Sequence, residues 1–260
     1  MADSKQRGSI IYLERVTVDF DGFKALRNLN FFVDYNELRV VIGPNGAGKS
    51  TLLDVISGKV KPASGRVIFG TGTDLVGVRE HEIARLGIGR KFQTPSVFTN
   101  LTVWENLDIS LRRKSKGLFA TLFAKPSSFE AEKISSALET IGLADQADAM
   151  AGALSHGQKQ WLEIGMVLVQ DPMLMLIDEP VAGMTDQETE KTGVLLQSLA
   201  DHHAVIVIEH DMQFVRQIAR TVTVLNEGTV LCEGPMEKIQ ADPRVIEIYL
   251  GPQKEANVTV

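Results

Sequence analysis

Three shortages in the amino-acid sequence narrow the classes of protein that it can encode. It has a single cysteine, Cys232, which excludes a disulfide bond within the chain. Its longest apolar runs, 173–177 and 204–208, have the length of strands and fall far short of the ~18 residues that a membrane-spanning helix requires. The 27 Lys and Arg residues are outnumbered by 33 Asp and Glu residues, and the net charge of −6 argues against a nucleic-acid surface. We therefore expect no nucleic-acid partner, and any role at a membrane must depend on other proteins.

The rest of the composition is that of an ordinary folded domain. Hydrophobic residues make up 44% of the 260 residues and charged residues 23%, which suits a soluble globular protein with a full core. Residues 1–9 have no apolar centre, so we expect no signal peptide and a cytosolic character. Cys232 ends a strand-like run, where a buried and unreactive thiol is the expected state.

Residues 43–51, with the sequence GPNGAGKST, match the pattern G-x-x-x-x-G-K-[ST] between a predicted strand and a predicted helix. The glycines let successive backbone N–H groups converge on an anion, and the helix N-terminus adds its positive end. The pattern predicts that Lys49 reaches the β- and γ-phosphates and that the Ser50 hydroxyl binds Mg²⁺. The correct flanking elements disfavour the alternative, a glycine-rich turn that happens to precede a helix. We expect a nucleoside-triphosphate site formed by Gly43, Asn45, Gly46, Ala47, Gly48, Lys49, Ser50 and Thr51.

Apolar periodicity and turn residues predict an α/β protein whose middle part is helical. Strands are expected at 10–20, 27–33, 38–42, 66–69, 86–93, 173–177, 204–208, 221–225 and 229–232. Helices are expected at 52–58, 102–111, 129–141, 155–170, 186–200, 211–219, 235–240 and 243–250. The patterns Thr102/Glu105 and Ser155/Gln158 are capping boxes, which typically begin helices. The alternation of strands and helices after residue 171 favours a mostly parallel sheet.

This pattern indicates a single P-loop α/β domain over 10–251, with a mixed-sheet core and an inserted helical subdomain. Its predicted parts are a tail at 1–9, a core at about 10–94 and 166–235, a helical subdomain at about 95–165, C-terminal helices at about 236–251 and a tail at 252–260. Within the insert, the basic run 112–116 is most often a solvated loop. The apolar octet 117–124 beside it either enters the core of the insert or docks on another protein or a membrane surface.

Polar residues that suit phosphate chemistry stand at the ends of predicted strands. A bound triphosphate brings Mg²⁺ and needs a carboxylate at the carboxyl edge of the sheet, so we assign Asp178 to Mg²⁺. Glu179, one residue further, is placed to orient or deprotonate the attacking water. His210 is expected to contact the γ-phosphate, and Gln93 is a candidate for the Mg²⁺ and water shell. Ser155 begins a capped helix whose N-terminus is also a possible anion site.

As an ordered set, the motifs resemble the ATP-binding subunits of ABC transporters over roughly residues 10–250. The matching segments are 43–51, Gln93, Leu154 to Gln158, Ile177 to Pro180 and Glu209 to Asp211. The resemblance implies an ABC ATPase fold and a head-to-tail dimer in which the Ser155 segment of one subunit closes over the ATP of the other. It implies that Ser155, Gly157 and Gln158 bind this ATP in trans and that Phe20 stacks on adenine. ATP and Mg²⁺ are the implied substrate and metal.

Two residues depart from the family pattern. His156 replaces the usual first glycine of the signature segment, which is tolerable if its side chain faces away from the phosphate. Thr185 stands where most members have an aspartate that contacts the partner subunit, which puts communication between the two sites in question.

The finer resemblance is to importers of branched-chain amino acids, amides and urea. Residues 155–166, 179–185 and 242–251 look most like the first of the two ATPase subunits of the urea importers. The implied partners are a second, non-identical ATPase subunit, with a homodimer possible in isolation, two membrane permease subunits and, indirectly, a solute-binding protein. The implied location is the cytoplasmic face of the membrane, as a peripheral subunit.

Three other classes of protein fit the sequence less well. A soluble ABC ATPase of repair or translation usually has tandem cassettes or long insertions, which this chain lacks. A GTPase would need an Asn-Lys-x-Asp motif, which is absent. A nucleotide-binding regulator without turnover is disfavoured by Glu179 and His210.

Overall fold

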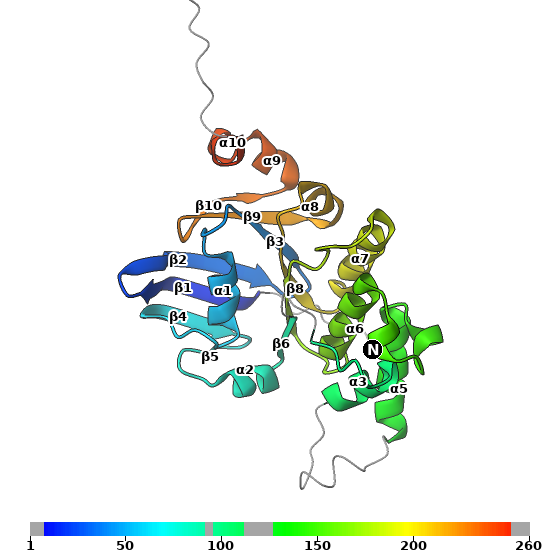
Figure 1. Ribbon diagram of the computed structural model, residues 1–260. Coiled ribbons are helices and arrows are strands. Elements are labelled where there is room, and N and C mark those ends of the chain that lie inside the picture. Colours follow the sequence, from blue (N-terminus) through cyan, green and yellow to red (C-terminus); the bar gives the residue numbers. More distant parts are fainter. Residues whose placement is uncertain (1–7, 92–95, 112–126, 251–260) are drawn as a thin grey trace, which may run out of the picture.

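The computed structural model describes residues 8–91, 96–111 and 127–250, and it arranges their strands in two sheets (Figure 1). A four-stranded antiparallel sheet has the order β2-β1-β4-β5. A six-stranded sheet has the order β10-β9-β3-β8-β7-β6 and is parallel except for β10. The strands are β1 (Ser9–Phe20), β2 (Phe23–Asp34), β3 (Leu38–Ile42), β4 (Ser64–Phe69), β5 (Thr73–Asp74), β6 (Ile88–Lys91), β7 (Leu174–Asp178), β8 (Ala204–Ile208), β9 (Thr221–Asn226) and β10 (Thr229–Gly234).

The helices are distributed along the whole described chain. They are α1 (Lys49–Ile56), α2 (Glu80–Leu86), α3 (Val103–Ser110), α5 (Ser128–Thr140), α6 (His156–Leu168), α7 (Asp186–Leu199), α8 (Met212–Ile218), α9 (Met236–Ala241) and α10 (Pro243–Leu250), with short 3-10 turns at Ala144–Gln146 and Ala151–Ala153. Among the described residues, no helix is both long and apolar enough to span a membrane. Helices α3, α5 and α6 pack on one another at one side of the molecule (Figure 1).

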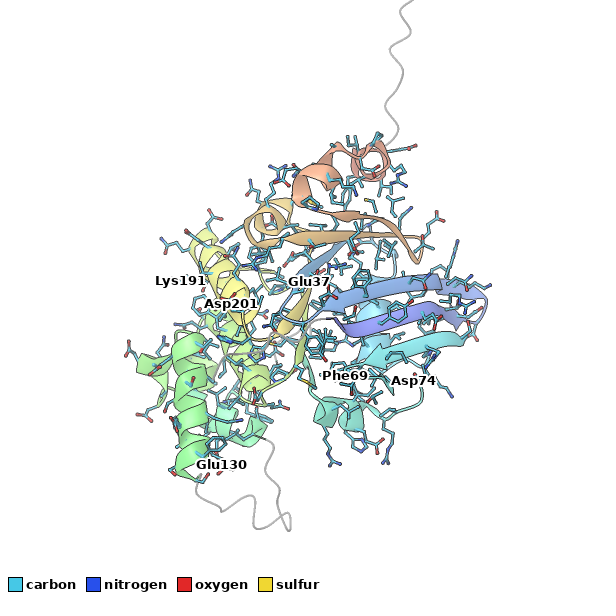
Figure 2. All side chains as sticks on the ribbon, turned by 180° about the vertical axis from the view of Figure 1, so that it is seen from behind. Glu37, Phe69, Asp74, Glu130, Lys191 and Asp201 are labelled. Atoms are coloured by element: carbon cyan, nitrogen blue, oxygen red, sulfur yellow. The ribbon has the colours of Figure 1, made fainter. Side chains whose placement is uncertain are left out.

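The six-stranded sheet is covered on both faces, which explains why its central strands read as continuous apolar runs. All five residues of β3, of β7 and of β8 are buried. Alternate residues pack on opposite sides: Val40 and Val207 belong to a core shared with α3, α5, α6 and α7, whereas Val41 belongs to a core shared with α1 and the antiparallel sheet. Phe69 of β4, labelled in Figure 2, lies in this second core.

Most of the predicted elements are present, and both predicted capping boxes are confirmed. The Thr102 and Ser155 side chains accept hydrogen bonds from the backbone N–H groups of Glu105 and Gln158. The strand predicted at 86–93 is wrong in its first part, because Glu80–Leu86 is helix α2 and ends at Gly87, whose φ is 110°. Only Ile83 of α2 is buried, so the helix has almost no apolar periodicity to reveal it.

Three further predictions concern Cys232, the boundary of the helical subdomain and the segment 112–124. Cys232 is only half-buried, at the side of the core, although burial does raise the pKa of its thiol. The predicted division near residue 165 falls within α6, which continues to Leu168 and packs on β6. The basic run and apolar octet at 112–124 lie outside the described residues.

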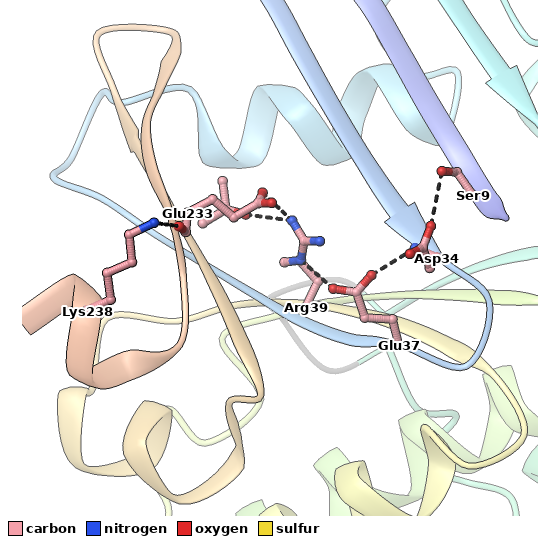
Figure 3. Close-up of polar contacts among 7 residues, drawn as sticks. Ser9, Asp34, Glu37, Arg39, Glu233 and Lys238 are labelled. Carbon is pink, nitrogen blue, oxygen red and sulfur yellow. Dashed lines mark hydrogen bonds and ion pairs between the residues drawn. The ribbon is translucent and has the colours of Figure 1, made fainter.

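A buried arginine joins the two sheets. Arg39 of β3 is 3% exposed, and its Nε lies 2.7 Å from Glu37 Oε1. Its Nη1 donates to Thr223 Oγ1 at 3.0 Å and to the carboxylate of Glu233 on β10 (Figure 3). The guanidinium also lies over the ring of Phe31 of β2, 5.8 Å from the centroid. The Arg39 network therefore connects the antiparallel sheet with strands β3, β9 and β10 of the larger sheet.

Replacement of Arg39 should cost far more stability than replacement of an exposed arginine. Arg39→Ala leaves two carboxylates without their partner, and we expect a loss of about 3 kcal/mol, the low end for a broken buried ion pair because both carboxylates keep some exposure. Arg66→Ala is the control: Arg66 is 62% exposed beside Asp74, and its loss should cost less than about 1 kcal/mol. Urea unfolding of both purified variants measures the difference. Equal losses would contradict a stabilising role for the network.

Candidate functional site

The phosphate loop connects the buried strand β3 to helix α1, and the backbone conformation and close packing at Gly48 require glycine there. Gly48 has a φ of 100°, in the region that favours glycine. A β-carbon built on Gly48 would lie 2.6 Å from the carbonyl oxygen of Ala25, which is closer than any side chain allows. The loop is therefore held between α1 and strand β2, in a curled form that suits the binding of an anion.

Lys49 is folded back over its own loop. Its Nζ donates hydrogen bonds to the carbonyl oxygens of Gly43 at 2.7 Å and Pro44 at 3.0 Å. Burial lowers the pKa of Lys49, and the carboxylates of Glu179 and Asp178 oppose that shift. A positive charge thus already stands inside the loop where the sequence pattern expects phosphate oxygens.

A cleft of about 320 Å³ brings most of the predicted nucleotide-binding residues together. Its lining consists of Phe20, Phe23, Ala25, Asn45, Gly46, Ala47, Gly48, Lys49, Ser50, Thr51, Glu179 and Ile208. Phe20 and Phe23 pair with each other at the turn between β1 and β2 and are 48% and 59% exposed. Sequence reasoning named Phe20 alone, although the two aromatics stand together at the mouth of the cleft.

The predicted carboxylates follow β7 at the same edge of the sheet. Asp178 is 6% exposed, and burial raises its pKa, an effect that Arg90 opposes and Glu179 increases. Glu179 has a φ of 45°, an uncommon conformation for a residue with a side chain, and its N–H donates to the carbonyl of Ile208 at 3.0 Å. Its Oε1 lies 3.4 Å from Nδ1 of His210, which follows β8. The structure therefore places Glu179, predicted to orient or deprotonate the attacking water, beside His210, predicted to contact the γ-phosphate.

A buried carboxylate that sequence reasoning did not assign to the site holds this edge together. Glu209 is 1% exposed and accepts hydrogen bonds from the N–H groups of His210 at 3.0 Å, Asp211 at 3.3 Å and Val181 at 3.4 Å. Burial raises its pKa, and these hydrogen bonds oppose the shift. Glu209 fixes the loop after β7 against the end of β8. Its position directly after a buried strand, like that of Asp178, is the sequence signal that could have revealed it.

Gln93 lies outside the described residues, but the residues on either side of it are anchored to α6. Lys91, 1% exposed at the end of β6, lies 3.6 Å from Glu163 of α6. The N–H of Ser96 donates to the other oxygen of the same carboxylate at 3.1 Å. Burial lowers the pKa of Lys91 and raises that of Glu163. The end of β6 is thus tied to the helix that begins at the Ser155 segment.

The residues proposed for Mg²⁺ have the chemistry of a magnesium site. Ser50 offers a hydroxyl oxygen in the cleft and Asp178 a carboxylate whose ionised form a cation would favour, and Mg²⁺ prefers such hard oxygen ligands. No group of three or more His, Cys, Asp or Glu side chains within 8–91, 96–111 and 127–250 is arranged to hold a metal. This suits an ion that takes one or two protein ligands and shares the rest with phosphates and water.

The Ser155 segment is not part of the cleft in the same chain. Ser155 is exposed and caps α6. The backbone N–H of Ser155 donates a hydrogen bond to Oε1 of Gln158 at 2.9 Å. Neither these residues nor Gly157 line the cleft around the phosphate loop. Nε2 of His156 lies 3.0 Å from the carbonyl oxygen of Ala182, so this side chain turns toward the loop before α7.

Comparison with known proteins accounts for the cleft and its motifs. The sequence profile described as ABC transporter matches residues 26–182, and one described as branched-chain amino acid ATP-binding cassette transporter matches residues 229–251. The chain is 37% identical over 240 residues to the high-affinity branched-chain amino acid transport ATP-binding protein LivG of Escherichia coli, which covers 89% of this chain and 94% of LivG.

Solved structures of ABC cassettes share the fold. The ADP conformation of an ATP-binding cassette of an ABC transporter superposes with a TM-score of 0.82 and 32% identity, over 94% of this chain and 100% of the other. A dimeric ATP-binding cassette in a post-hydrolysis state, bound to ADP and Pi, gives a TM-score of 0.71 and 26% identity, over 87% of this chain and 98% of the other. The chain therefore belongs to the ABC transporter family, as an ATPase subunit of the branched-chain amino acid type whose ATP hydrolysis is coupled to transport.

Proposed function

We propose that this chain is the energy subunit of an importer and that its ATP site is completed by a second subunit. The observation that carries this proposal is the separation within one chain of two anion-binding elements: the phosphate-loop cleft and the exposed N-terminus of α6 at Ser155. The dimeric cassette bound to ADP and Pi supports an arrangement in which such elements from two subunits meet. Ser155, Gly157 and Gln158 then contact the γ-phosphate in trans.

In the cis half of the proposed site, each residue has a separate task. The N–H groups of the phosphate loop and Lys49 hold the phosphates, for which Lys49 must leave the carbonyls of Gly43 and Pro44. Ser50 and Asp178 would hold Mg²⁺, which offsets the negative charge that builds on the phosphates. Glu179 orients or deprotonates the attacking water, His210 contacts the γ-phosphate, and Gln93 joins the metal and water shell. Most of the catalysis then comes from positioning and charge.

The partners and cargo are proposed from the relatives and from the sequence. We propose a non-identical second ATPase subunit, two membrane permease subunits and, indirectly, a solute-binding protein, with this chain as a peripheral subunit at the cytoplasmic face of the membrane. Branched-chain amino acids are the first candidate cargo, because LivG and the profile at residues 229–251 carry that description. Urea is the second, because residues 155–166, 179–185 and 242–251 resemble urea-importer ATPases.

Replacement of Glu179 should separate ATP binding from hydrolysis. We expect Glu179→Gln to lower ATP turnover at least about 100-fold, the usual contribution of a general base, while it still binds ATP and accumulates a closed dimer. Steady-state ATPase assays and light scattering with Mg-ATP measure both effects. Glu80→Gln, a change of the same kind on the exposed start of α2, should behave like the unchanged protein. Undiminished hydrolysis in Glu179→Gln would contradict the assignment.

Adenine stacking on Phe20 is tested against its neighbour. Phe20→Ala should weaken ATP binding by about 1–3 kcal/mol, which corresponds to roughly 5- to 150-fold in Kd, because a stacked base is lost. Phe23→Ala removes an equally exposed aromatic from the same cleft and should change Kd less than about twofold if Phe20 alone stacks. Calorimetric titration with a non-hydrolysable ATP analogue measures both values. A larger loss in Phe23→Ala would transfer the role to Phe23.

Transport by the native complex decides the cargo. Co-purification from the native membrane should recover two permease subunits and a second ATPase chain. After reconstitution in vesicles, we expect ATP-dependent uptake of labelled leucine if branched-chain amino acids are the cargo, and of labelled urea if the finer resemblance is correct. A complex that carries neither solute would contradict both candidates, and recovery of the chain without any permease would contradict the importer.

A further inference from the structure

One carboxylate joins the N-termini of helices α6 and α7. Glu188 lies in the first turn of α7, and its Oε1 accepts a hydrogen bond from the Ser155 hydroxyl at 2.9 Å. Its Oε2 accepts two more from Thr185, one from the N–H and one from the hydroxyl, both at 3.0 Å. Glu188 therefore connects the segment proposed to bind phosphate in trans with the residue at the family's subunit-contact position.

The Glu188 carboxylate contacts Gly157 as well as Ser155 in the proposed phosphate-binding segment. A β-carbon built on Gly157 would lie 2.5 Å from the carboxyl carbon of Glu188, so the carboxylate rests directly on this glycine. The hydrogen bonds from the Thr185 N–H and the Ser155 hydroxyl lower the pKa of Glu188, which keeps it ionised at neutral pH. The Glu188 carboxylate thus occupies the hydroxyl and the glycine face that the γ-phosphate is proposed to use.

We propose that Glu188 is a positioning residue that holds the Ser155 hydroxyl until the γ-phosphate of the partner's ATP displaces it, and that it thereby sets the ATP concentration at which two subunits close. This inference rests on the proposed function, because it requires phosphate binding in trans. A serine hydroxyl has one proton to donate, so it cannot serve the carboxylate and the phosphate together. The Glu188 carboxylate and a γ-phosphate bound beside it also repel each other, which raises the free-energy cost of closure.

The exchange has a second effect, on Thr185. When Ser155 turns to the phosphate, Glu188 keeps only its hydrogen bonds to Thr185, at the start of α7. Phosphate binding at the α6 terminus is thus transmitted to the subunit-contact position through one side chain. This pairing also explains the departure at Thr185: an aspartate there would lack the hydroxyl proton that Glu188 accepts and would place a second negative charge beside it.

Glu188→Gln tests the inference, because the one amide oxygen of glutamine keeps the capping-box acceptor for Thr185. Its NH2 group cannot accept the Ser155 proton, and the side chain carries no charge. The experiment uses the full chain with Glu179→Gln, so that ATP is not consumed, and follows dimer formation by sedimentation as Mg-ATP is raised. We expect Glu188→Gln to lower the ATP concentration for half-maximal dimer about fivefold or more. Glu190→Gln removes an exposed charge two residues along the same helix and should leave that concentration unchanged.

Ser155→Ala separates competition for the hydroxyl from a general charge effect. In that background, Glu188→Gln should shift the midpoint less than about twofold, because the contested hydrogen bond is gone. An equal shift with and without Ser155, or no shift in the Ser155 chain, would overturn the inference alone. If the chain alone stays monomeric at every ATP concentration, the titration is repeated with the second ATPase subunit of the native complex, and absence of closure with that subunit as well would overturn the proposed function together with the inference. Thermal unfolding of each variant verifies that the fold is kept.

Discussion

A strand that is buried on both faces cannot carry an unpaired charge along its length, and this constraint shapes the site. The central strands β3, β7 and β8 are fully buried, so the carboxylates of the site stand at or just beyond the carboxyl ends of β7 and β8, which a parallel sheet brings to one edge. Asp178 closes β7 at that edge, and Glu179 and His210 follow β7 and β8. Arg39 within β3 is tolerated because Glu37 and Glu233 pair with it.

The crowding of charge at this edge requires compensation, and the neighbouring elements supply it. Arg90 of β6 donates to Asp54 of α1 at 2.7 Å and also opposes the rise in the pKa of Asp178. Lys91, one residue further, pairs with Glu163 of α6. Two successive residues of β6 thus connect this strand to helix α1 on one face of the sheet and to helix α6 on the other. The link between α6 and β6 therefore lies beside Asp178, the carboxylate proposed to hold Mg²⁺.

Local patterns predicted local features, whereas features formed by distant residues escaped prediction. The phosphate loop, the buried strands β7 and β8 and the caps at Thr102 and Ser155 each have a signal within about ten residues. The division of the strands into two sheets depends on pairing across the chain, which no short pattern encodes. Likewise, Glu188 lies 33 residues from Ser155 in sequence, and its hydrogen bond to that hydroxyl follows only from the packing of α6 and α7. Phe23 was not assigned to the site because the strand was predicted to begin at residue 27, whereas β2 begins at Phe23 and brings it opposite Phe20.

The hydrogen bonds of Lys49 to Gly43 and Pro44 bear on the timing of the ATPase cycle. A cation seated on the carbonyl oxygens of its own loop holds the curvature of that loop, so nucleotide binding does not require the backbone to refold. The lysine needs only to rotate, and side-chain rotations take picoseconds to nanoseconds, whereas collective movements of domains take microseconds to milliseconds. In the proposed two-subunit cycle, the rotation of Lys49 would therefore be fast compared with the meeting and parting of the subunits.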